Sequence, residues 1–230
     1  MIKWACGVTT VPSRGPILLL TLNSILDAGF PVPRVFMDQP ELAGRSEAGS
    51  LGVFGNWCRA TVELYIRNPE ADRYVLFQDD IILCRNVRQY LESVRYLDQH
   101  YWNLYTSADQ VKTCDGFQES RECESGKIYH GKKQQGGRGA LALVFSREVL
   151  QVLLASMRFV RWSCDPVRGH QNLDGVICES LNEVGYRELV HFPGLVEHRE
   201  SVSTVKDKLY QRSSHFAGEQ FDALQLLSNC

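Results

Sequence analysis

The sequence has no long apolar segment, no closely paired cysteines and little net charge, and each absence excludes a class of protein. Its longest aliphatic run, residues 17–20, is far too short to cross a bilayer. The eight cysteines form no C-x-x-C pair, which argues against a structural zinc site and favours buried, reduced thiols. The net charge of -2 excludes a wholly basic nucleic-acid coat. No apolar signal-peptide segment opens the chain, so we expect a cytoplasmic protein.

The composition and the order of apolar segments predict a globular α/β protein. Hydrophobic residues make up 44% of the 230 positions and charged residues 23%, which suits one domain with a real core. Short apolar runs alternate with helical patterns, as in βαβ units. The expected strands are 3–8, 34–37, 73–77, 140–145 and 193–198. The expected helices are 16–28, 54–67, 86–97, 147–157, 173–184 and 216–227.

Two adjacent acids, Asp79 and Asp80, lie at the C-terminal end of the expected apolar strand 73–77, after Gln78. Ligands of open α/β sheets bind beyond the carboxyl ends of the strands. Two carboxylates there, with no cation beside them in the sequence, suit a hard divalent ion that carries a diphosphate. The alternative is that they only end the strand and begin a loop.

The segment around these acids resembles the D-x-D region of GT-A fold glycosyltransferases, in the variant that reads acid-Asp-Asp before an apolar run. Gln78 stands where that family usually has an acid, and its amide can still hydrogen-bond a hydroxyl. Further segments resemble the family in the same order, from residue 4 to about 204. They are Thr9-Thr10 with Arg14, residues 52–57 with Asn56, residues 139–147, residues 172–175 with Asp174, and residues 193–198 with His198.

This resemblance implies a GT-A-like, Rossmann-like mixed sheet, mostly parallel, with helices on both faces, in a single domain spanning 1–230. Residues 1–100 would bind a nucleotide sugar, residues 101–204 would hold the acceptor and the catalytic groups, and residues 205–230 would form a helical tail. The implied activity is transfer of a sugar from a nucleotide-diphosphate sugar, with UDP-sugars favoured, to an acceptor hydroxyl.

The resemblance also implies roles for individual residues. Asp80 and His198 would hold Mn²⁺ or Mg²⁺, and Asp174 would be the general base. The donor would be bound by Thr9, Thr10, Arg14, Asp38, Asn56, Gln78, Asp79 and Arg138. Simpler readings stay open: His198 as an exposed loop histidine, Asp174 as a helix N-cap, and the glycine-rich segment 136–139 as a plain turn instead of a phosphate cradle.

Residues 127–170 carry eight basic and two acidic side chains in a chain whose net charge is -2. Such a surplus suits a polyanionic acceptor, although many charge runs are only solvated faces. Small phage-type enzymes of the family modify hydroxymethylated DNA bases, which makes a 5-hydroxymethylated pyrimidine the expected acceptor and a bacterial cell or phage-infected host the expected compartment. The expected phosphate contacts are Lys132, Lys133, Arg158 and Arg161.

Other functions compete with this interpretation. A bacterial surface glycan is the alternative acceptor, and a non-catalytic glycan- or nucleic-acid-binding protein is the alternative class. A nucleotidyltransferase is disfavoured because residues 9–14 contain neither glycine nor lysine. Hydride transfer is disfavoured because no G-x-G-x-x-G follows the first strand.

Overall fold

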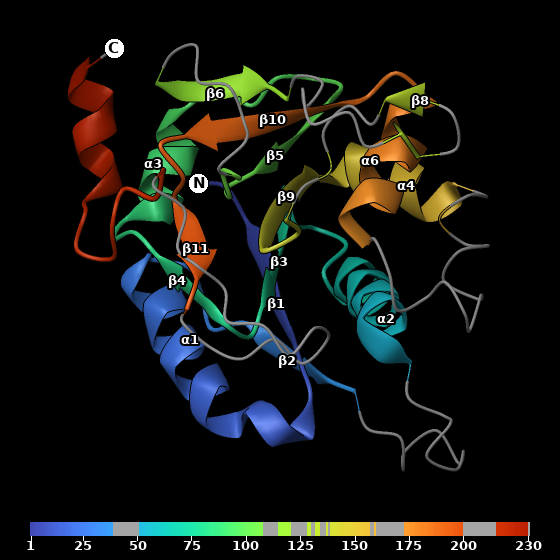
Figure 1. Ribbon diagram of the computed structural model, residues 1–230, viewed down its shortest axis with the longest axis horizontal. Helices are drawn as coiled ribbons and strands as arrows, with labels where there is room; N and C mark the ends of the chain where they lie inside the picture. Colours follow the sequence, from blue (N-terminus) through green and yellow to red (C-terminus); the bar gives the residue numbers. More distant parts are fainter. Residues whose placement is uncertain are drawn as a thin grey trace.

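A seven-stranded mixed sheet forms the centre of the protein, in the strand order β2-β1-β3-β9-β5-β10-β6 (Figure 1). The computed structural model describes residues 1–38, 51–107, 115–120, 128–129, 132–133, 137, 139–156, 159, 173–199 and 215–229. The sheet consists of β1 (Trp4–Thr10), β2 (Arg34–Met37), β3 (Arg73–Gln78), β5 (His100–Asn103), β6 (Gly116–Glu119), β9 (Ala142–Ser146) and β10 (Arg187–Phe192). Two short antiparallel pairs accompany it: β4 (Ile81–Leu83) with β11 (Val196–His198), and β7 (Ile128–Tyr129) with β8 (Lys132–Lys133).

Most strands of the sheet run in one direction. Strand β1 is parallel to β2 and β3, and β5 is parallel to β10. Strand β9 is antiparallel to both β3 and β5, and β6 is antiparallel to β10. Five strands therefore share a direction and two oppose it, which confirms the predicted mostly parallel mixed sheet. The carboxyl ends of β1, β2, β3 and β5 meet at one edge, called the carboxyl edge below.

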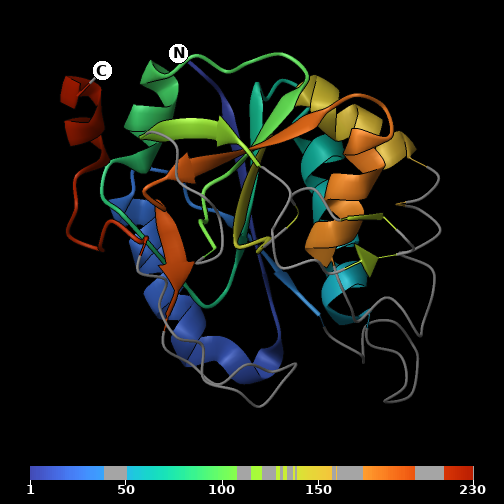
Figure 2. The ribbon, with the colours of Figure 1, turned by 45° about the horizontal axis from the view of Figure 1, so that its top comes forward.

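Helices cover both faces of the sheet, as predicted (Figure 2). One face carries α1 (Gly15–Asp27), α3 (Val87–Ser93) and the 3-10 helix η4 (Ala223–Asn229). The other carries α2 (Gly52–Arg67), α4 (Arg147–Ala155) and α6 (Leu173–Asn182). Among the described helices, none is both long and apolar enough to span a bilayer.

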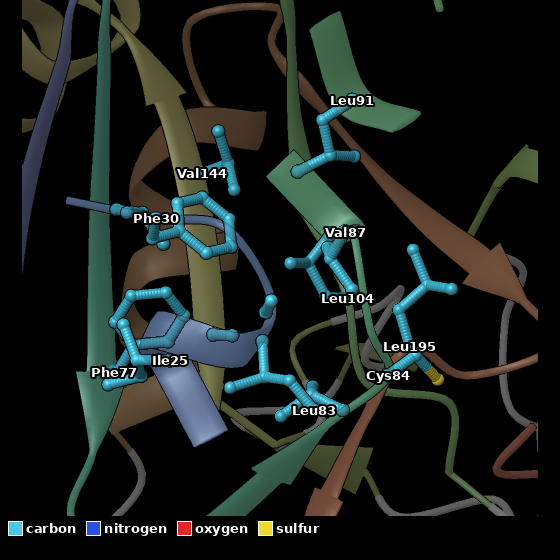
Figure 3. Close-up of a cluster of buried hydrophobic side chains, with 14 of the residues drawn as sticks. Ile25, Phe30, Phe77, Leu83, Cys84, Val87, Leu91, Leu104, Val144 and Leu195 are labelled. Carbon is cyan, nitrogen blue, oxygen red and sulfur yellow. The ribbon is translucent and has the colours of Figure 1, made fainter. Parts of the chain in front are cut away.

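Strand β3 contributes to two cores because alternate side chains of a strand point to opposite faces. Val75 and Phe77 pack under α1 and α3, in the core that Figure 3 shows. Tyr74 and Leu76 pack under α2, α4 and α6. All four side chains are essentially inaccessible to solvent. Because β3 is buried on both faces, its sequence is an uninterrupted apolar run, and this run correctly predicted a central strand.

Several expected elements differ from the structure. Strands β5, β6 and β10 were not predicted, because polar residues interrupt their short apolar patterns. The expected terminal helix over 216–227 is a 3-10 helix that begins only at Ala223. The expected helix over 86–97 ends at Ser93, where Val94 turns to extended backbone. In α1 the buried face contains Thr21 and Ser24 beside Leu18 and Ile25, whereas Leu26 is 45% exposed.

His191 in β10 is a fully buried polar residue. Its Nε2 lies 2.8 Å from the Tyr90 hydroxyl, and its Nδ1 lies 2.6 Å from the carbonyl oxygen of Pro193. A neutral ring that donates from Nδ1 to this carbonyl and accepts at Nε2 from Tyr90 satisfies both contacts. Burial lowers the pKa of His191 from 6.5 to about 4, although Pro193 and Asp115 act in the opposite direction.

A His191→Asn variant is expected to lose part of the acid sensitivity of the fold. The unfolded chain takes up a proton on His191 near pH 6.5, but the folded protein does so only near pH 4. The contribution of the neutral ring is therefore complete above pH 6.5 and is lost as the pH falls to 4, by roughly 3 kcal/mol of unfolding free energy. Urea unfolding of the unmodified protein and of His191→Asn between pH 6.5 and pH 4 measures this loss of unfolding free energy. An equal loss in the variant would contradict the assignment.

Candidate functional site

Asp79 and Asp80, the acid pair, lie at the carboxyl edge in the turn between β3 and β4. They are only 4% and 3% exposed. Charged carboxylates are expensive to bury without partners, so the residues around them determine what the pair can do.

Arg14 spans the acid pair from the loop that follows β1. Its Nη1 lies 2.8 Å from Oδ1 of Asp79, and its Nη2 lies 3.0 Å from Oδ2 of Asp80. The Thr10 hydroxyl donates to the other oxygen of Asp79 at 2.6 Å. The sequence places no cation beside the two acids, but the fold supplies one from 65 and 66 residues away.

Helix α1 holds the backbone of this turn through two buried hydroxyls. The Thr21 hydroxyl donates to the carbonyl of Asp79 at 2.7 Å and accepts from the N–H of Ile81 at 3.2 Å. Ser24 accepts from the N–H of Leu83 at 2.8 Å. Polar residues therefore replace leucine on this face because they fix the backbone that carries the acid pair.

His198 reaches the acid pair because β11 pairs with β4, opposite Ile81. Its Nδ1 lies 3.6 Å from Oδ2 of Asp80, and the next residue, Arg199, donates its N–H to the carbonyl of Asp80. Burial acts to raise the pKa of Asp80, but His198 and Arg14 outweigh it, so this pKa lies below its ordinary value. Burial raises the pKa of Asp79 despite Thr10 and Arg14.

One atom of the acid pair is available to a cation. Oδ1 of Asp80 is buried and has no hydrogen-bond partner among the residues that the structure describes. Among the described residues, no three His, Cys, Asp or Glu side chains are arranged as a complete metal cage. Mg²⁺ is commonly held by one or two carboxylates together with water and substrate phosphates. Asp80 and His198 thus fit a cation that takes its remaining ligands from a bound diphosphate and water.

Asp174 lies in the first turn of α6 and accepts a hydrogen bond from the segment that precedes β9. Its Oδ2 accepts the N–H of Gly139 at 2.7 Å, and its Oδ1 accepts the N–H of Gly175 at 3.1 Å. Gly137 donates in the same way to Oε2 of the buried Glu188, at 2.8 Å. Gly137 and Gly139 both have positive φ, which favours glycine. These two amides serve carboxylates of the protein, which favours the plain-turn reading of this segment over a phosphate cradle.

Tyr105 connects the region of Asp174 with the acid pair. A Cβ at Gly139 would collide with the Tyr105 ring, and the centre of this ring lies 6.2 Å from that of His198. Asn103, at the end of β5, fixes Tyr105 by accepting its N–H at 3.0 Å. The fold therefore brings Arg14, the acid pair, His198, Tyr105 and Asp174 into one continuous region.

The remaining predicted donor-binding residues have structural partners at the same edge. Asp38 accepts the N–H groups of Leu51 and Gly52 at the start of α2, at 3.1 and 2.9 Å. Asn56 donates from Nδ2 to the carbonyl of Phe36 at 2.9 Å. Thr9 donates to the carbonyl of Phe77, and Gln78 donates its N–H to Leu141.

Several predicted contacts are not placed by the structure. Arg138, Arg158 and Arg161 lie outside the described residues. Lys132 and Lys133 form β8, which pairs with β7, and their backbone alone is described.

Sequence reasoning did not identify five polar residues that build the region. They are Thr21, Ser24, Asn103, Tyr105 and Glu188. Thr21, Ser24, Asn103 and Glu188 lie in helices or strands among apolar residues, which is the signal that could have drawn attention to them, whereas Tyr105 follows the end of β5. Burial raises the pKa of Glu188, even though Gly137 and Asn103 hydrogen-bond its carboxylate.

Comparisons with known proteins identify similar folds only. No protein-family model matches the chain, and no curated protein matches it. A glycosyltransferase involved in glycosylation of the major capsid of PBCV-1 is 10% identical with a TM-score of 0.45, covering 83% of this chain and 82% of that one. A197 from STIV is 14% identical with a TM-score of 0.43, covering 94% and 97%. A mannose-1-phosphate geranyltransferase from Thermus thermophilus is 13% identical with a TM-score of 0.42, covering 83% and 74%. Because these TM-scores lie below 0.5, the similarities do not assign an activity to the chain.

Proposed function

We propose that this protein is a glycosyltransferase that takes its sugar from a nucleotide-diphosphate sugar. The observation that carries the proposal is the acid pair at the carboxyl edge, with Arg14 across it and His198 beside Asp80. Arg14 offers a cationic contact for a diphosphate, and Asp80 offers a carboxylate oxygen for a divalent ion. It lies where ligands of open α/β sheets bind.

The chemistry requires stabilisation of the leaving diphosphate. Negative charge grows on it as the glycosidic bond breaks, while the sugar carbon gains oxocarbenium character. Arg14 would bind the phosphate oxygens through charge-assisted hydrogen bonds. Mn²⁺ or Mg²⁺, held by Asp80 and His198, would supply Lewis-acid stabilisation of the same charge. UDP-sugars are the donors proposed for the first tests.

Asp174 is the proposed general base for the acceptor hydroxyl. Its carboxylate is anchored by the N–H of Gly139 and Gly175, and Tyr105 lies between Gly139 and His198. The anchoring fixes the position of the carboxylate, which general-base catalysis requires. The proposed acceptor is a 5-hydroxymethylated pyrimidine in DNA, supported only by the basic surplus of residues 127–170.

Asp80→Asn is expected to abolish Mn²⁺-dependent binding of the donor and to reduce transfer on the order of 100-fold or more, because it removes a metal-ligating charge at nearly constant shape. The measurement is a thermal-shift screen of UDP- and GDP-sugars with and without Mn²⁺, since a ligand of the folded state raises the melting temperature. Asp72→Asn is the matched control, because Asp72 precedes β3 at the opposite edge and contacts the N–H of Lys3. Normal donor binding by Asp80→Asn would remove the metal assignment. No shift with any donor in the unmodified protein would favour a non-catalytic binding protein.

Asp174→Asn is expected to reduce sugar transfer by about 10²- to 10⁴-fold while donor binding stays unchanged. The amide oxygen of asparagine can still accept the N–H of Gly139, so this variant removes basicity and keeps one of the two anchoring hydrogen bonds. Asp174→Ala should also lower the melting temperature, because it removes both. Full transfer activity in Asp174→Asn, with loss only in Asp174→Ala, would show that the residue serves the turn and is not the base.

Binding to hydroxymethylated DNA is expected to weaken steeply with added salt, because phosphate contacts release counterions. Replacing Lys132 and Lys133 by Gln should reduce the slope of log K against log salt by about 2. Arg67→Gln is the control, since this exposed side chain on α2 lies outside residues 127–170. Fluorescence anisotropy between low and moderate salt measures the slopes. Salt-independent binding would argue against phosphate contacts by residues 127–170 and would leave a bacterial surface glycan as the alternative acceptor.

A further inference from the structure

Arg14 occupies the carboxylate oxygens that a bound cation would share. Its two terminal nitrogens contact one oxygen of Asp79 and one of Asp80, and Thr10 takes the second oxygen of Asp79. Within the described part of the chain, only Oδ1 of Asp80 remains, buried and without a hydrogen-bond partner. A cation that approaches this oxygen therefore meets the positive guanidinium on the same carboxylate.

The charges of the region make Arg14 and a bound cation compete for the acid pair. Two carboxylates that are almost inaccessible to solvent need compensation, and Arg14 supplies one positive charge against two negative ones. A divalent cation would neutralise the pair completely without Arg14, whereas both together would leave a net positive charge. The guanidinium and the cation thus repel each other over a short distance, where screening by water is weak.

We propose that Arg14 is an exchangeable counter-ion, which neutralises the acid pair when no divalent cation is bound and moves to the donor diphosphate when one binds. The inference rests on the proposed function and adds to it how binding of the metal and of the donor is linked. The diphosphate takes Arg14 away from the carboxylates, so it strengthens cation binding, and the cation releases Arg14 for the diphosphate. Such linkage is reciprocal by thermodynamic necessity.

The position of Arg14 permits this exchange. The residue ends the 3-10 helix η1 (Pro12–Arg14) and precedes the first turn of α1, so its backbone is fixed while its side chain reaches across to the acids. The side chain is 11% exposed, against 6% and 4% for those of Asp79 and Asp80, so it lies on the outer side of the pair. Arginine also binds phosphate oxygens with the same two-pronged geometry that it uses for carboxylates.

Titration calorimetry with Mn²⁺ alone tests the exchange without a donor sugar. Arg14→Gln is expected to bind Mn²⁺ on the order of tenfold more tightly than the unmodified protein, because the competing charge is gone. UDP should tighten Mn²⁺ binding in the unmodified protein, and by a smaller factor in Arg14→Gln. Arg88→Gln is the matched control: it removes the same charge from an arginine that contacts Glu92 and the carbonyl of Gly29, and it should leave Mn²⁺ binding unchanged.

Unchanged or weaker Mn²⁺ binding by Arg14→Gln would overturn the exchange, and the proposed function would stand if UDP still binds with Mn²⁺. Failure of the unmodified protein to bind either Mn²⁺ or UDP would remove both proposals. Arg14→Lys covers the case in which Arg14→Gln does not fold, because it keeps the charge and loses the two-pronged contact. Because its positive charge remains on the acid pair, it should bind Mn²⁺ about as weakly as the unmodified protein without UDP and more tightly with UDP, and tighter binding without UDP would overturn the exchange.

Discussion

The burial of two adjacent carboxylates at the end of β3 is the constraint on which this region of the protein depends. Asp79 and Asp80 are almost inaccessible to solvent, and removing one partner from a buried ion pair costs about 3–5 kcal/mol. The fold meets this demand with elements from distant parts of the sequence. The loop after β1 supplies Arg14, helix α1 supplies hydroxyls for the backbone of the turn, and β11 brings His198 to Asp80. The contacts that compensate the charges also fix their geometry.

Carboxylates that need hydrogen-bond donors also determine the segment that precedes β9. Asp174 and Glu188 are each held by the N–H of a glycine with positive φ, Gly139 and Gly137. Side chains larger than glycine would collide with Tyr105 or with α6 at these two positions. The turn therefore follows from two carboxylates that need donors and from two glycines that permit the close approach. Its described amides are directed into the protein and not toward a ligand.

The sequence predicted those parts of the structure that depend on local apolar patterns. Strand β2 has the predicted bounds, and β3 extends the predicted range by one residue. In β3 continuous burial on both faces leaves an unambiguous apolar run. Strands β5 and β10 were not predicted from the sequence, because they contain the polar residues Asn103, Glu188 and His191. These residues are buried in hydrogen-bond networks that hydrophobic periodicity does not reveal. The acid pair was found from its place after β3. The ion pairs between Arg14 and these acids were not predicted, because a contact across 65 residues depends on the packing of β1 against β3.

The two members of the acid pair are not equivalent, although they are adjacent in the sequence. Both oxygens of Asp79 have partners, Arg14 and Thr10, so this carboxylate serves to position the guanidinium. Asp80 keeps one buried oxygen that no described residue contacts by a hydrogen bond, and it has His198 close to the other. The pKa values shift in the corresponding directions, upward for Asp79 through burial and downward for Asp80 because His198 and Arg14 outweigh burial. Asp80 is thus the carboxylate placed to bind a cation. Asp79 holds the Arg14 guanidinium beside the position that this cation would take.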